Sequence, residues 1–368
     1  MQKSILLGVS LLLLGGIGEI APTSAQAEIL VTQENGSKQA VSQQLNKLLT
    51  QGRKLVDAGN WSEAIALYKK AAKLEQNNPR IYSGIGYLHG MQGNYAAAAA
   101  AYRQAVALEP KNPDFHYALA YSLGKLGEND GAAQAYRRTI ELDQDNSNAY
   151  LGFGVIMLRQ GNYNNAIAAY EKALALDPDN AEAYGFLGEI LIRQGRSLEA
   201  ISVLQKSAQI NPNNSNVLLS LADAWGKQGN NTARLLTLQQ VARLEPGNAK
   251  VHLVIGNMLL EQNDLDNAIL AYERALAVQP NLVTAQEAIG NILLTRGELK
   301  PAIRAYRRLI ALSPQDGNAY YSLGVALQQQ QQTPEAIAAF SRARELYQQK
   351  GQLEGLQKAE AALKQLQL

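Results

Sequence analysis

The residues whose side chains suit acid–base or metal chemistry are few in this chain and widely separated. Three histidines, His89, His116 and His252, are the candidate proton acceptors and metal ligands. The sequence has no cysteine, which excludes disulfides, thiolate metal sites and cysteine nucleophiles. A zinc site needs three or four ligands gathered around one point. We therefore predict no metal site and expect the histidine rings to serve in packing.

Some glycine-rich and acidic fragments have the residue types of a binding loop. None of them lies in the structural context that such a loop needs. Gly84–Gly86 and Gly152–Gly154 lie inside helical patterns, whereas a nucleotide-binding loop follows a strand. Acidic pairs such as Asp177 and Asp179 lie in turns between helical patterns, where exposure to solvent explains them. We find no catalytic set of residues, and we predict that the protein is not an enzyme and binds no cofactor.

The charge of the chain is nearly balanced. The 34 Lys and Arg residues and 32 Asp and Glu residues leave a net charge of +2. A dedicated nucleic-acid-binding protein normally carries a clear excess of basic residues on one face. We therefore expect no nucleic-acid partner.

The elements that would position any site repeat with a fixed period of 34 residues. Each copy contains two amphipathic helical patterns joined by a short turn, which predicts an antiparallel helix hairpin. A fixed period without insertions is the signature of a stacked solenoid. The nine repeats span residues 45–78, 79–112, 113–146, 147–180, 181–214, 215–248, 249–282, 283–316 and 317–350.

Three columns of the repeat explain how the two helices approach each other. The eighth residue is Gly or Ala in every repeat, and the twentieth is Ala in all repeats but one. Small residues at both places allow the helices to cross closely, and a Tyr or Phe at the twenty-fourth place in most repeats fills the remaining space. The exception at the twentieth place is Arg234. Either Ala233 takes its place, or the Arg234 side chain extends outward to solvent.

The ends of the helices are marked in the same periodic way. A Gly at the fifteenth place, or Asn263 in one repeat, suits the left-handed residue that ends a first helix. An Asn at the last place of most repeats predicts an N-cap for the following helix. In the last repeat Gln328–Gln332 replaces this turn, and we expect these glutamines to continue the helix.

This combination of columns resembles the tetratricopeptide repeat family, and Ser147–Asn180 is its clearest copy. The resemblance covers roughly residues 45–350. It implies an all-α, right-handed superhelical solenoid of antiparallel helix hairpins, with a concave groove lined by the first helices. Members of the family usually bind proteins or peptides in that groove, so the resemblance implies a partner of this kind.

The two ends of the chain differ from the repeats. Residues 1–27 have the charge, apolar run and Ala25–Ala27 small-residue pattern of a cleaved signal peptide, and the run is short for a membrane span. We expect export to a periplasm, a thylakoid lumen or the extracellular space, with an uncleaved anchor as the alternative. Residues 28–44 form a leader and the start of the first helix, with residues 28–37 flexible. Residues 351–368 form an amphipathic capping helix.

A basic column runs along the predicted groove. The thirteenth place is basic in four consecutive repeats: Lys125, Arg159, Arg193 and Lys227. These cations could bind an acidic segment of a partner, or they could simply suit the negative ends of their helices. Glu189 and Asp223 precede Arg193 and Lys227 by four residues, so both cations can pair within their own helices. Lys125 and Arg159 have no acidic residue at that spacing.

Aromatic and amide side chains complete the candidate groove. Three tyrosines occupy groove columns beside Lys125, and tyrosine is common where binding energy is concentrated: Tyr87, Tyr117 and Tyr121. Asn257 and Asn291 both occupy the ninth place of their repeats and could hold a peptide backbone. Leu253, Asn318 and Ser322 occupy the places where relatives that clamp a C-terminal carboxylate have basic residues, so that activity is not implied.

These observations lead to one main hypothesis and two alternatives. The main hypothesis is an exported scaffold that binds a protein or peptide segment in its groove and assists the assembly of a complex. The first alternative is a non-catalytic accessory subunit of an envelope enzyme complex that processes glycans or the cell wall. The second is a helical repeat protein that binds RNA, which the near-neutral charge disfavours.

Overall fold

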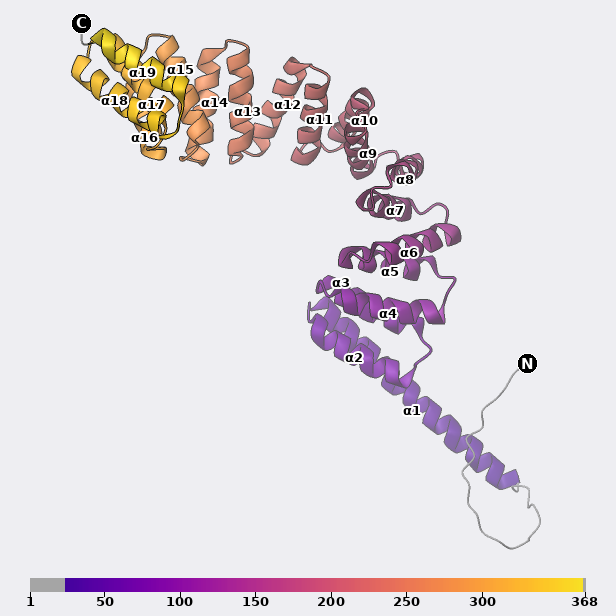
Figure 1. The fold of residues 1–368 in the computed structure, drawn as a ribbon. Coiled ribbons are helices and arrows are strands. Elements are labelled where there is room, and N and C mark those ends of the chain that lie inside the picture. Colours follow the sequence, from indigo (N-terminus) through magenta and orange to yellow (C-terminus); the bar gives the residue numbers. More distant parts are fainter. Residues whose placement is uncertain (1–23, 367–368) are drawn as a thin grey trace. The chain divides into compact units, whose positions relative to one another are not determined.

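The computed structural model describes residues 24–366, with side chains from residue 38 onward. This part of the chain consists of nineteen α-helices and contains no strand, as the repeat pattern predicts (Figure 1). The chain divides into an N-terminal segment that ends at Gly152 and a C-terminal segment that begins at Phe153. Most of the predicted signal peptide, residues 1–23, lies outside the described residues.

The helices alternate as first and second helices of successive hairpins. Those that precede the boundary are α1 (Ser24–Asp57), α2 (Trp61–Leu74), α3 (Pro79–Met91), α4 (Tyr95–Leu108), α5 (Pro113–Leu126) and α6 (Asn129–Leu142), and α7 (Ser147–Arg159) contains it. The following helices are α8 (Tyr163–Leu176), α9 (Ala181–Arg193), α10 (Ser197–Ile210), α11 (Ser215–Lys227), α12 (Asn231–Leu244), α13 (Ala249–Glu261), α14 (Leu265–Val278), α15 (Val283–Thr295), α16 (Leu299–Leu312), α17 (Gly317–Gln329), α18 (Thr333–Gln349) and α19 (Leu353–Leu366).

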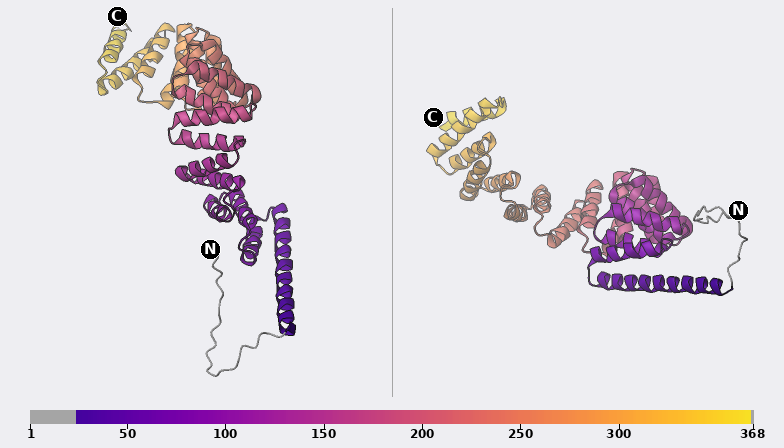
Figure 2. Two further views of the ribbon diagram at one scale, coloured as in Figure 1. Left: turned by 90° about the vertical axis from the view of Figure 1, so that its right-hand side faces the viewer. Right: turned by 90° about the horizontal axis from the view of Figure 1, so that it is seen from below.

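The first helix is longer than the repeat pattern predicts. We expected residues 28–37 to form a flexible leader, but α1 continues through them, and Figure 2 shows its N-terminal part extending beyond α2. Glu28, Leu30, Gln33 and Glu34 of this stretch are good helix formers, and they act against the roughly 1 kcal/mol that Gly36 costs inside a helix. None of the helices in the described residues is long and apolar enough to cross a membrane.

In most hairpins the two helices meet where a small residue faces a ring. Tyr272 and Tyr306 are fully buried, and their rings lie against Gly256 and Gly290 of the first helices. A Cβ atom added to Gly256 would lie 2.6 Å from the Tyr272 ring, which is closer than van der Waals contact permits. The alanines at the twentieth place are also fully buried wherever they occur, as in Ala268 and Ala302. The small-residue columns therefore set the close approach of the helices, as predicted.

Arg234 shows how the one large residue at the twentieth place is accommodated. Its half-buried side chain runs across Gly226 of α11, where the absence of a Cβ leaves room for it. Ala233 is also only half-buried, so it does not take the inner position. Of the two alternatives for this repeat, the outward path of Arg234 is the one that the structure supports.

The helix caps and the turn residues lie where the sequence predicts them, with one exception. Each predicted asparagine cap accepts a backbone N–H of the next helix, and Asn112 and Asn180 are examples. Asn263 adopts a left-handed conformation with φ 59°, as expected for the residue that replaces Gly. The prediction that Gln328–Gln332 continues a helix is wrong. α17 ends at Gln329, and Gln331 makes the turn with φ 62°, because the chain must reverse here to enter α18, the second helix of the same hairpin.

The last helix covers the end of the core. Ala362 and Leu363 of α19 pack with Phe340 and Leu327 of the final hairpin, and Ala359 packs beside Tyr347. Leu353, at the start of the helix, is exposed. The cap that solenoids need at their ends is therefore supplied by the second half of α19.

Replacing Gly by Ala should change stability in opposite directions at a glycine that faces a buried ring and at one that faces open space. We predict that Gly256→Ala lowers the free energy of unfolding by about 1–3 kcal/mol, because the new Cβ would collide with the buried Tyr272 ring. Gly90→Ala is the matched control, because nothing lies within 4 Å of its added Cβ. It should stabilise the protein by about 0.4–1 kcal/mol. Chemical denaturation followed by circular dichroism measures both, and equal effects would contradict this packing.

Candidate functional site

Two asparagines on the first helices are held by buried tyrosines of the second helices. The Tyr272 hydroxyl donates a hydrogen bond of 2.8 Å to Oδ1 of Asn257, and the Tyr306 hydroxyl donates one of 2.8 Å to Oδ1 of Asn291. Both tyrosine rings are fully buried, whereas both asparagines are exposed. The ring that packs the hairpin thus also fixes a polar group at the surface.

This bond determines what each amide presents to its surroundings. An asparagine side chain has one acceptor oxygen and an NH₂ group with two donor hydrogens. Because Oδ1 accepts the tyrosine hydroxyl, the Nδ2 group of Asn257 or Asn291 is the part available to bind an acceptor outside the protein. The two residues occupy the same place on α13 and α15, so they offer the same kind of donor in adjacent repeats.

A third asparagine is held in the same way near the C-terminus. The Tyr347 hydroxyl donates to Oδ1 of Asn318 over 2.8 Å, and Asn318 is exposed on α17. Both residues line a cavity of about 500 Å³ together with Tyr321, Ser322 and Lys358. Our sequence analysis missed this pair, because Tyr347 lies in the extra turn of α18, outside the columns that the repeats share.

Tyr170 lacks the hydrogen-bond partner that Tyr272, Tyr306 and Tyr347 have. Its hydroxyl is buried without a hydrogen bond, and Val155 occupies the place that corresponds to Asn257. The ring stacks on Phe186 at a centroid distance of 5.6 Å. Burial raises the pKa of the Tyr170 hydroxyl well above its usual value, and the charges of Glu189 and Glu182 add to this effect. Burial likewise raises the pKa of Tyr306 to about 12, so both hydroxyls stay protonated at neutral pH.

Two cations of the basic column are paired inside their own helices, as their spacing predicts. Arg193 binds Glu189 at 2.7 Å, and Lys227 binds Asp223 at 2.9 Å. The hydrogen bond to Glu189 raises the pKa of the Arg193 guanidinium. These local pairs already account for both cations. Arg159 is exposed at the end of α7, and its charge opposes the rise in the pKa of Tyr170.

The N-terminal segment carries a separate group of aromatic residues. Tyr87 and Tyr121 have exposed fractions of 55% and 45%. The Lys125 ammonium lies 5.3 Å from the centroid of the Tyr121 ring, and Tyr95 meets the same ring edge-on at 6.3 Å. We name Tyr87, Tyr121 and Lys125 the tyrosine surface. Tyr117 is half-buried against Tyr136, so packing explains it.

The histidines have structural surroundings, as expected. The His116 and His252 rings are buried, and each lies 3.0 Å from the carbonyl oxygen of a proline in the preceding turn. Burial lowers the pKa of His89. Within residues 38–366, whose side chains are described, no group of histidine and acidic residues could hold a metal ion.

Comparisons with known families match nearly the whole chain. A family model described as the C-terminal domain of cilia and flagella-associated protein 70 matches residues 19–288. Models described as TPR repeat and tetratricopeptide repeat match residues 290–331 and 318–349. No curated protein sequence matches this chain.

Solved structures of other repeat proteins resemble parts of the chain. A tetratricopeptide repeat protein from Parabacteroides merdae has 19% identity and a TM-score of 0.50, with 68% of this chain and 99% of that chain covered, and it shares the fold. MamA has 26% identity and a TM-score of 0.43 over 44% of this chain and 94% of its own. YrrB, described as a TPR protein with an unusual peptide-binding site, has 23% identity and a TM-score of 0.46, covering 52% and 98%.

Removing the hydroxyl from two equivalent tyrosines should change stability differently. Tyr272→Phe loses a hydrogen bond, so we predict that it lowers the free energy of unfolding by about 0.5–1.5 kcal/mol. Tyr170→Phe removes a buried hydroxyl that has no partner, so it should be neutral or stabilising. Denaturant titration of both variants checks this, and an equal loss of stability in the two would contradict the difference in hydrogen bonding.

Proposed function

Because the chain belongs to the tetratricopeptide repeat family, we propose that it is a non-enzymatic scaffold that binds a peptide or protein segment along its first helices. We name the exposed side of α13, α15 and α17 that carries Asn257, Asn291 and Asn318 the amide face. The proposal places the backbone of an extended segment on this face.

The chemistry of the amide face suits the backbone of a peptide. An extended chain displays one carbonyl acceptor per residue, and an edge that is not paired in a sheet leaves these groups available. Uncharged amide donors can bind such carbonyls without reading the side chains, so contacts of this kind hold many sequences in one register. The observation that carries the proposal is the pair of 2.8 Å bonds from Tyr272 and Tyr306, which orient Asn257 and Asn291 before any partner arrives.

The tyrosine surface supports a second contact with the partner. Its two exposed rings offer apolar area at a low entropic cost, and the Lys125 ammonium has no carboxylate within ion-pair distance among the described residues. An acidic stretch of the partner would meet Lys125 here, whereas Arg193 and Lys227 are already paired with their own helices. Arg159, at the end of α7, is exposed and is a further candidate cation for an acidic partner.

We also propose a cellular location and a role for the protein. The signal-like residues 1–27 support export, and an array of hairpins without catalytic groups suits a scaffold that assists the assembly of a complex. The partner would therefore be a protein of the same exported compartment.

Loss of the two oriented amides should weaken partner binding. We predict that Asn257→Ala combined with Asn291→Ala weakens binding by about tenfold, because two hydrogen bonds of about 0.5–1.5 kcal/mol each are lost. The measurement is affinity purification of the full-length chain from the exported compartment. It is followed by titration of each recovered protein against wild type and variant.

The matched control replaces exposed asparagines on second helices. Asn164→Ala combined with Asn231→Ala removes two amides that lie outside the amide face, and it should leave binding unchanged. A second variant, Tyr121→Ala with Lys125→Ala, tests the tyrosine surface. If every recovered protein binds the Asn257 and Asn291 variant as tightly as wild type, the amide face is not the binding site.

Processing of the N-terminus tests the proposed location. We predict that the mature chain begins at Glu28, because the Ala25–Ala27 pattern is a small-residue cleavage signal. Mass spectrometry of the protein recovered from its native host measures the N-terminus directly. Ala27→Arg should block cleavage and leave the longer chain. A cytoplasmic protein that still begins at Met1 would contradict export.

A further inference from the structure

A cleft opens on the side of α13 that faces away from the amide face. It lies between α12 and α14 and has a volume of about 530 Å³, which is enough to hold a few large side chains. Its floor is formed by Ile255 and Leu259, which are each two positions from Asn257 along α13. Two positions correspond to rather more than half a turn of an α-helix. The floor and the exposed amide of Asn257 therefore point in opposite directions.

A small side chain of α12, Ala242, lines the cleft at the twenty-eighth place of its repeat. α2 and α10 also have Ala there (Ala72 and Ala208), whereas α8, α14 and α16 have the larger Leu174, Leu276 and Ile310. A leucine at this place would fill space above Ile255 and Leu259. Because the missing volume is open to the surface, it forms a cleft and not a closed cavity.

The cleft combines an apolar floor with an apolar rim. Ile255, Leu259 and Ala271 are buried at its base. Leu270 lines the edge with an exposed fraction of 45%. It occupies the twenty-second place, where every other repeat except that of α12 has Ala, Ser, Gln or Arg. The rim of the cleft on α14 is therefore more apolar than the same place in most other repeats.

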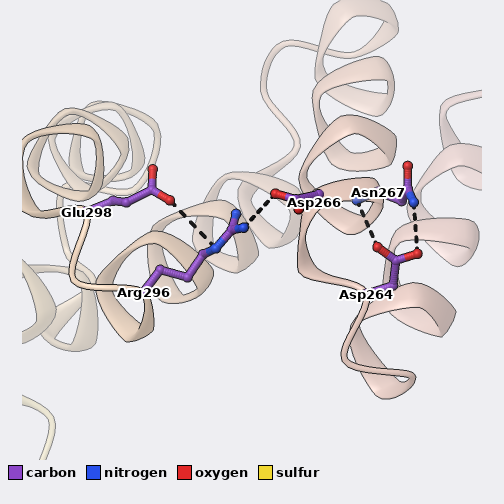
Figure 3. A network of polar contacts seen from close by, with 5 residues as sticks. All are labelled: Asp264, Asp266, Asn267, Arg296 and Glu298. Atoms are coloured by element: carbon purple, nitrogen blue, oxygen red, sulfur yellow. Dashed lines mark hydrogen bonds and ion pairs between the residues drawn. The ribbon is translucent and has the colours of Figure 1, made fainter.

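Two guanidinium groups flank this apolar surface. Arg243 and Arg274 both line the cleft and are exposed, and neither has a carboxylate within ion-pair distance in the described part of the chain. The one acidic side chain of the lining, Asp264, is already engaged. Both of its oxygens accept hydrogen bonds from Asn267, as Figure 3 shows.

The nearby carboxylate of Asp266 also forms an ion pair within the protein. Asp266 binds Arg296 at 2.6 Å, and the same guanidinium reaches Glu298 at 3.6 Å (Figure 3). This network holds the start of α14 to the turn after α15, and it leaves the charges of Arg243 and Arg274 uncompensated. A ligand that brings carboxylates together with a large apolar side chain would satisfy both features of the cleft.

We propose that this cleft is a second docking site, which binds an acidic peptide segment of a partner protein through a Leu or Phe side chain. The apolar side chain lies on Ile255 and Leu259, and flanking carboxylates bind Arg243 and Arg274. This site is independent of the amide face. The chain can therefore hold two protein segments at once, one on each side of α13.

The test uses two synthetic peptides and the full-length chain. The first is a short fluorescent peptide in which pairs of Glu alternate with Leu or Phe, and the second has Lys in place of every Glu. Fluorescence anisotropy should show binding of the acidic peptide only. Ala242→Leu fills the cleft, and Arg243→Glu with Arg274→Glu reverses its charge, so each should weaken binding at least about tenfold.

Matched variants separate this site from its surroundings and from the amide face. Arg308→Glu reverses a cation at the same place as Arg274 in the next repeat and should leave binding unchanged. Asn257→Ala should also leave it unchanged, whereas it is expected to weaken binding to the amide face. The charge-reversal pair lies on the surface, so it reports on the cleft even if Ala242→Leu disturbs folding. Equal binding of both peptides, or binding that neither cleft variant weakens, would overturn the proposal.

Discussion

The close packing of a small residue against a buried ring is the constraint on which the rest of this structure depends. A glycine such as Gly256 has no Cβ, and the ring of Tyr272 occupies the volume that a Cβ would need. Because interiors pack at near-crystalline density, this contact sets how closely the two helices of a hairpin approach. The stack of hairpins repeats the contact, which explains why the sequence varies freely at exposed places and so little at the eighth, twentieth and twenty-fourth.

The same packing buries the hydroxyl group of the tyrosine, and this links the fold to the candidate site. A tyrosine ring fills the gap, but its hydroxyl must then find a partner or stay buried without one. In two adjacent repeats the partner is an exposed asparagine, Asn257 or Asn291, so a packing residue orients a recognition group. In the repeat of Tyr170 the partner is absent, and Val155 leaves an apolar surface where the others present an amide. Differences at one surface position therefore change what each repeat can bind while the core stays the same.

Much of the fold could be predicted from the sequence, because its determinants are local and recur along the chain. The Gly and Ala columns, the asparagine caps and the pairing of Arg193 with Glu189 all depend on residues at fixed spacing. Other features depend on context. The helical state of residues 28–37 and the turn at Gln331 differ from our predictions. The hydrogen bond between Tyr272 and Asn257 joins residues of different helices, and the cleft beside Ala242 is lined by residues of three helices. Neither feature follows from residues at a fixed spacing along the sequence.

The central claim is that a buried tyrosine and an exposed asparagine act as one unit, and a double-mutant cycle tests it most directly. The free energy of unfolding is measured for wild type, Tyr272→Phe, Asn257→Ala and the double variant. We predict that the two substitutions are not additive, with a coupling of about 0.5–1.5 kcal/mol, because both remove the same hydrogen bond. Effects that simply add, with no coupling, would show that the Tyr272 hydroxyl does not hold Asn257.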